Sequence, residues 1–88
     1  MIGDIDGMID GAIKSRMLTV DYNESIASHY IIIAGYMMKE MEENIEYYIN
    51  SAEHIISSVG MKNLDNIILS QYYTIKGVYY KDILIAKL

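Results

Sequence analysis

The spacing of apolar residues is the feature of this chain that most restricts its fold. From residue 22 to residue 41 they recur every three or four positions, and the same spacing runs through residues 45–59 and 64–86. Such a repeat gathers apolar side chains on one face of an α-helix, whereas a half-buried strand needs strict alternation. Isoleucine and tyrosine favour strands by propensity, but no Asn-Gly or Asp-Gly hairpin lies between alternating runs. The sequence therefore predicts an all-α fold of antiparallel helical hairpins.

Residues at the ends of these segments indicate where the helices begin and end. Asp21, followed three residues later by Glu24, is typical of a capping pair at a helix start. Gly60 predicts a C-terminal stop, and Asn63 predicts the cap of the next helix. We expect helices at about 3–18, 22–40, 42–59 and 63–87, within one domain of residues 1–88.

Composition excludes several classes of protein. The net charge is −5, which repels a phosphate backbone and argues against a nucleic-acid partner. The longest uncharged apolar run, residues 30–38, falls far short of the ~20 residues that cross a bilayer. Asp4 and Asp6 stand where a signal peptide would carry positive charge. We expect a cytoplasmic protein with no membrane partner.

The chain also contains an internal repeat. Six of the sixteen residues 26–41 are identical to the residues 42 positions later. The identical pairs are Ile26 and Ile68, Ser28 and Ser70, Tyr30 and Tyr72, Ile33 and Ile75, Gly35 and Gly77, and Lys39 and Lys81. A repeat of this length indicates a helical solenoid. If the two middle helices pair antiparallel about a turn near Met41, Gly35 lies opposite Tyr48, and Gly77 is expected to face a bulky residue of a further helix.

Two short motifs resemble the tetratricopeptide repeat. Residues 44–52, Asn-Ile-Glu-Tyr-Tyr-Ile-Asn-Ser-Ala, are similar to the second helix of that repeat, and residues 76–81, Lys-Gly-Val-Tyr-Tyr-Lys, are similar to the first. The 42-residue spacing exceeds the usual repeat of about 34 residues and is similar to the extended repeats of bacterial and archaeal regulators. The resemblance implies a leading helix in residues 1–21, a helix pair in 22–62 and the first helix of a second repeat in 63–88. The alternative is a plain four-helix bundle.

The resemblance also implies a binding surface, because the first helices of tetratricopeptide repeats line a concave face that holds peptides. The corresponding polar and aromatic stripe on the helix predicted at 22–40 contains His29, Ile32, Tyr36 and Lys39. Its equivalents on the last helix are Gln71, Thr74, Val78 and Lys81. We expect this stripe to bind a protein or peptide partner; the alternative is an ordinary half-exposed face.

The two ends of the chain suggest self-association. Residues 1–24 carry a net charge of −3 and residues 61–88 carry +2, which favours head-to-tail stacking of copies. The final stretch is apolar nearly all round, and its expected self-association residues are Ile83, Leu84, Ile85 and Leu88. A solenoid normally ends in a polar capping helix, so a homo-oligomer is expected.

Catalytic and metal-binding signals are weak. No Gly-x-Ser-x-Gly elbow, phosphate loop or His-Glu-x-x-His motif occurs. His29 and His54 are expected to lie level on adjacent helices, but zinc needs three or four protein ligands, so packing at a helix interface is favoured. We expect no catalytic residue, metal or cofactor. The predicted function is a non-enzymatic interaction module that binds a peptide or partner helix; the alternative is a self-associating four-helix bundle acting as a small regulatory subunit.

Overall fold

The computed structural model describes residues 4–18 and 20–86, with the backbone alone at residues 83 and 84, and within these residues the fold is all-α. The four helices are α1 (Ile5–Leu18), α2 (Tyr22–Met38), α3 (Glu42–Val59) and α4 (Asn66–Ala86), with a short 3₁₀ turn at Met61–Asn63. The predicted fold class is confirmed. The expected outer limits at residues 3 and 87 lie outside the described residues.

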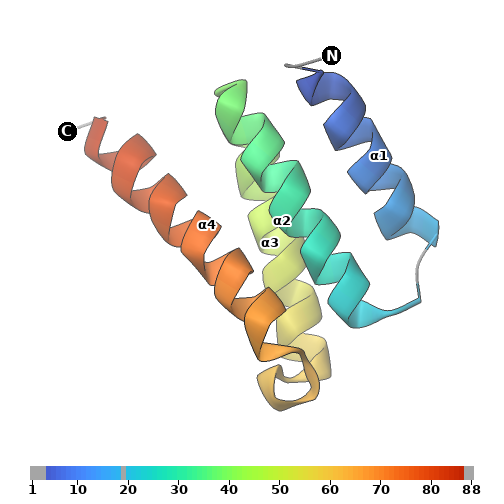
Figure 1. The fold of residues 1–88 in the computed structure, drawn as a ribbon. Helices are drawn as coiled ribbons and strands as arrows, with labels where there is room; N and C mark the ends of the chain where they lie inside the picture. Colours follow the sequence, from blue (N-terminus) through green and yellow to red (C-terminus); the bar gives the residue numbers. More distant parts are fainter. Residues whose placement is uncertain (1–3, 19, 87–88) are drawn as a thin grey trace.

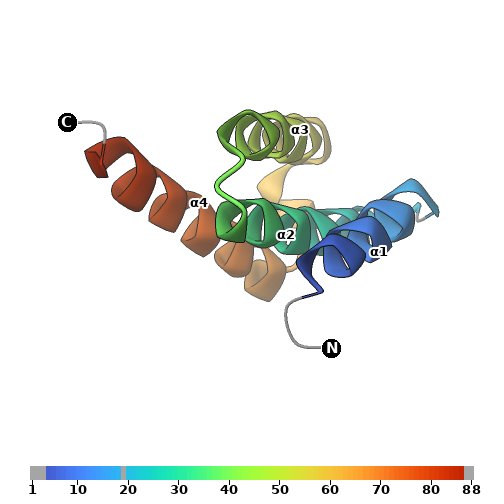
Figure 2. The same ribbon diagram turned by 90° about the horizontal axis from the view of Figure 1, so that it is seen from above.

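Helix α2 is the centre of the arrangement. Helices α1, α3 and α4 each pack closely against α2. Helices α1 and α4 lie on opposite sides of α2 and form a layer with it, and α3 covers one face of that layer (Figures 1 and 2). Helices α3 and α4 are further apart than either is from α2, and tyrosine side chains of α4 bridge the distance to α3. The core between α2, α3 and α4 is built mainly from isoleucine and tyrosine: Ile26, Ile33, Ile45, Ile49, Ala52, Ile56, Leu64, Leu69, Tyr72 and Tyr79.

The boundaries of α2 and α3 have clear physical causes. The Asp21 carboxylate accepts a hydrogen bond from the amide of Asn23 at 2.8 Å, which confirms Asp21 as the cap of α2. Gly60 has φ of +90°, a conformation that residues with a side chain rarely adopt, and α3 ends there as predicted. Helix α2 ends at Met38, not at residue 40, because Glu40 turns into the left-handed region with φ of 56°.

The prediction that Asn63 caps the last helix is wrong. Its side-chain amide instead donates to the carbonyl of Val59 at 2.8 Å and so satisfies the C-terminus of α3. Asp65 performs the predicted role, accepting hydrogen bonds from the amides of Ile67 and Ile68 at 2.8 and 3.2 Å. The amide of Asp65 itself donates to the side-chain oxygen of Asn23 at 2.7 Å, which joins the starts of α2 and α4. The two residues are 42 positions apart, the length of the internal repeat.

The close approach at Gly35 involves a different helix from the one expected. The antiparallel register of α2 and α3 agrees with the expectation, since the rings of Tyr36 and Tyr48 stack with centroids 5.9 Å apart. Gly35, however, faces α1: a Cβ added there would lie 2.5 Å from Cγ1 of Ile9. The expected Gly35–Tyr48 contact is therefore wrong, because the leading helix occupies the glycine side of α2.

Candidate functional site

The predicted stripe on α2 is largely covered by other helices. His29 and Ile32 are both fully buried, so the expectation that they line an accessible surface is wrong. Tyr36 is half-buried against Tyr48, and the ammonium of Lys39 forms an ion pair with the carboxylate of Asp6. The physical reason is packing on two sides of α2, because His29 contacts Ser51 of α3 and Lys39 meets α1.

His29 is held inside the helix interface by two hydrogen bonds. Nδ1 lies 2.7 Å from the carbonyl oxygen of Ser25 and Nε2 lies 2.9 Å from Oγ of Ser51. A carbonyl only accepts, so Nδ1 carries a proton, and in the neutral ring Nε2 accepts from the Ser51 hydroxyl. Burial lowers the pKa of His29, the hydrogen bond to Ser25 opposes this shift, and the nearby Arg16 charge adds to it. His29 is thus a neutral, satisfied interface residue.

The second histidine does not join the first. His54 is exposed on α3, whereas the partner of His29 on that helix is Ser51. Within residues 4–18 and 20–86, no group of three or more histidine and carboxylate side chains is placed to hold a metal ion.

The equivalent stripe on α4 is open. Gln71, Thr74 and Lys81 are all exposed, and the Thr74 hydroxyl donates only to the carbonyl of Ser70 in its own helix. Apolar side chains accompany them: Ile67 is 71% exposed and Ile85 is 59% exposed. We call this surface the outer face of α4. Its residues, which recur every three or four positions, are Ile67, Ser70, Gln71, Thr74, Gly77, Val78, Lys81 and Ile85.

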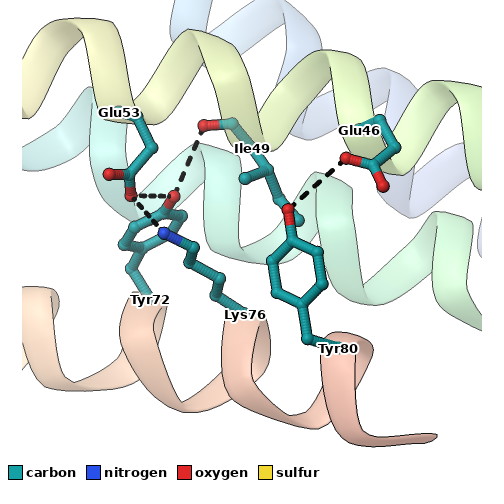
Figure 3. A network of polar contacts seen from close by, with 6 residues as sticks. All are labelled: Glu46, Ile49, Glu53, Tyr72, Lys76 and Tyr80. Carbon is teal, nitrogen blue, oxygen red and sulfur yellow. Dashed lines mark hydrogen bonds and ion pairs between the residues drawn. The ribbon is translucent and has the colours of Figure 1, made fainter. Parts of the chain in front are cut away.

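The opposite face of α4 is anchored to α3 by tyrosine hydroxyls (Figure 3). Tyr72 has a fully buried ring, and its hydroxyl donates to the carboxylate of Glu53 at 2.6 Å. The ammonium of Lys76 lies 3.2 Å from the same carboxylate. One end of α4 is thereby fixed by a hydrogen bond and an ion pair to a single glutamate.

A second anchor lies two turns further along α4. The Tyr79 hydroxyl donates to one oxygen of Glu46 at 2.8 Å, and the Tyr80 hydroxyl lies 3.5 Å from the other oxygen. Burial raises the pKa of Tyr72 and of Tyr79, and the neighbouring carboxylates raise both further. The hydroxyls stay protonated at neutral pH, so they act as hydrogen-bond donors and not as bases.

The sequence analysis did not identify these anchors. A signal was present in the spacing. The two glutamates are seven residues apart, as are Tyr72 and Tyr79, and seven residues bring a helix back to nearly the same face. Antiparallel helices with matching heptad spacings can pair both sets at once.

The expected self-association residues are only partly described. Ile85 is exposed at the end of α4, while the side chains of Ile83 and Leu84 and the whole of Leu88 lie outside the described residues. Within the described residues, the helices are each too short or too polar to cross a bilayer.

Comparisons with known proteins do not assign the chain to a family. The tetratricopeptide resemblance stays a prediction, since searches against models of protein families, curated proteins and solved structures found no match to this chain.

Proposed function

We propose that this chain is a non-enzymatic, cytoplasmic protein–protein interaction module that binds a peptide or partner helix on the outer face of α4. The observation that supports the proposal is the exposure of this entire face, including large apolar side chains at Ile67, Val78 and Ile85. Burying apolar surface is the main source of favourable free energy in protein association.

The contrast with α2 gives further support. The stripe on α2 is covered within the chain, and its basic residue Lys39 already has an acidic partner in Asp6. On α4, Gln71, Thr74 and Lys81 present a donor amide, a methyl group and a positive charge to solvent. A partner helix can bury the apolar residues and meet Lys81 with a carboxylate. In a tetratricopeptide-like arrangement, α2 and α3 form one helix pair and α4 is the first helix of the next.

The test is selection of helical peptides from a displayed library against the immobilised chain. Selected peptides are expected to bind the wild type and to lose binding to a Thr74→Glu, Val78→Glu double variant. The matched control places the same two substitutions at Asn50 and Ser57, which are exposed on α3. Circular dichroism verifies that both variants are folded.

Two results contradict the proposal. One is a library that yields no binder. The other is binding that the α4 variant leaves unchanged. A separate measurement addresses self-association. The mass of the wild type in solution is measured over a range of protein concentrations. A dimer that the α4 double variant abolishes would assign this face to a second copy and favour the self-associating bundle.

A further inference from the structure

We infer that the outer face of α4 accepts an acidic amphipathic helix of the same chemistry as α1. This inference rests on the proposed function and names the partner class of the same face. The argument comes from the internal repeat, because the chain itself contains a helix docked on the equivalent face of α2.

The face of α2 that meets α1 has four positions about one helical turn apart, and contacts with α1 are made at Gly35 and Lys39. Ser28 and Ile32 are buried, and Gly35 admits Ile9 so closely that a Cβ added to the glycine would lie 2.5 Å from Cγ1 of Ile9. Lys39 completes the set by pairing with Asp6. The elements of recognition are therefore a small residue at Ser28, a glycine notch that receives an isoleucine, and a lysine that pairs with an acid three residues before that isoleucine.

The same elements recur on α4, and there they are unoccupied. Ser28, Gly35 and Lys39 correspond to Ser70, Gly77 and Lys81, and Ile32 corresponds to Thr74. Ser70, Thr74, Gly77 and Lys81 are all exposed, and a Cβ added at Gly77 would meet no atom within 4 Å. The notch that Ile9 fills on α2 is open on α4.

Charge favours the same class of partner. Residues 1–24, which contain α1, carry a net charge of −3, whereas the charged residue of the outer face of α4 is the exposed Lys81. A helix with an aspartate or glutamate three residues before an isoleucine or leucine, and a small residue three positions later, reproduces Asp6, Ile9 and Ala12. Such a helix gains an ion pair with Lys81 and fills the notch at Gly77.

The chain's own α1 is not free to do this, because the side that carries Ile9 and Ala12 is buried in the existing fold. The occupant is therefore a separate acidic helix. The probe is a synthetic peptide of residues 4–18 with blocked termini, held helical by a side-chain link between positions 11 and 15, both exposed in α1.

Titration of the full ¹⁵N-labelled chain with this peptide is followed by NMR. We expect the largest shifts at the amides of Ser70, Thr74 and Gly77. Gly77→Leu fills the notch and should weaken binding about fivefold or more, the equivalent of an overpacked contact. The matched control, Gly11→Leu on the open side of α1, should bind as the wild type does.

Charge reversal gives an independent readout. Lys81→Glu should weaken binding about two- to fivefold, the range of an exposed ion pair, and a peptide carrying Asp6→Lys should restore it. Shifts confined to Gly35 would mean that the peptide merely replaces the chain's own α1, and this would overturn the inference. So would absence of peptide binding, and in that case library peptides that still bind the outer face of α4 would leave the proposed function standing.

Discussion

The two equivalent glycines, Gly35 and Gly77, provide the sharpest test of the structure, because the same substitution should have different consequences at each. Replacing glycine by alanine inside a helix removes a propensity cost of about 1 kcal/mol. At Gly77 nothing lies within 4 Å of the new Cβ, so the whole gain is expected. Gly77→Ala should raise the midpoint of thermal unfolding by about 4–8 °C.

At Gly35 the gain is opposed by a steric cost. The new Cβ would lie 2.5 Å from Cγ1 and 2.9 Å from Cδ1 of Ile9, which is 3% exposed and, as a β-branched residue, stiff at χ1. Overpacking of this kind costs about 1–3 kcal/mol. Gly35→Ala should therefore be about 1–3 kcal/mol less stable than Gly77→Ala.

Urea unfolding followed by far-UV circular dichroism measures the free energy of unfolding of both variants. The two values can be compared if the free energy depends on urea concentration with the same slope in each. A double-mutant cycle identifies the cause: Ile9→Ala removes the two clashing carbons, so the cost of Gly35→Ala should largely vanish in that background. Equal stabilisation by the two alanines, or a cost at Gly35 that is independent of Ile9, would refute the packing of α1 on α2.

Three other predictions concern stability. Tyr72→Phe removes the hydroxyl that donates to Glu53 and should lower the free energy of unfolding in urea by about 0.5–1.5 kcal/mol. Tyr47→Phe, at a residue 61% exposed, should change that free energy by no more than about 0.5 kcal/mol. Burial lowers the pKa of His29, so its contribution to stability is complete above the ordinary value of 6.5 and is lost as pH falls towards the folded value. The free energy of unfolding should thus fall more steeply between about pH 7 and 5 in the wild type than in His29→Gln; parallel curves would contradict this. Gly60→Ala forces a side chain into φ of +90° and should lower the free energy of unfolding by about 1–3 kcal/mol. An unchanged midpoint of urea unfolding would contradict this prediction.

The helical fold was predictable because the spacing of apolar residues along each segment is a local signal, and the packing of the helices buries the residues that carry it. Asp21 and Gly60 were predictable for the same reason: a cap depends on the neighbouring few residues. The prediction for Asn63 was wrong because two residues that can cap a helix, Asn63 and Asp65, lie two positions apart. The 3₁₀ turn, in which the Asn63 side chain bonds to the carbonyl of Val59, leaves Asp65 as the residue that caps α4.

The site was less predictable because it depends on which helix covers which face. The repeat predicted equivalent positions on α2 and α4, but periodicity does not tell an occupied face from an open one. Tertiary packing made that difference. His29 lies against α3 and Gly35 and Lys39 meet α1, whereas Gln71 and Thr74 are exposed. The pairing of tyrosine hydroxyls with Glu46 and Glu53 needed the antiparallel register, which a pattern on one helix does not supply.

The two glutamate anchors have a consequence for how α4 meets a ligand. Tyr72 and Tyr79 fasten the helix at points seven residues apart, about 10 Å along its axis. Two fastenings resist both rotation about the axis and sliding along it, since a one-turn slip would break both bonds together. A ligand on the far side of α4 therefore meets a preorganised surface, and little of its binding free energy is spent on ordering the receptor.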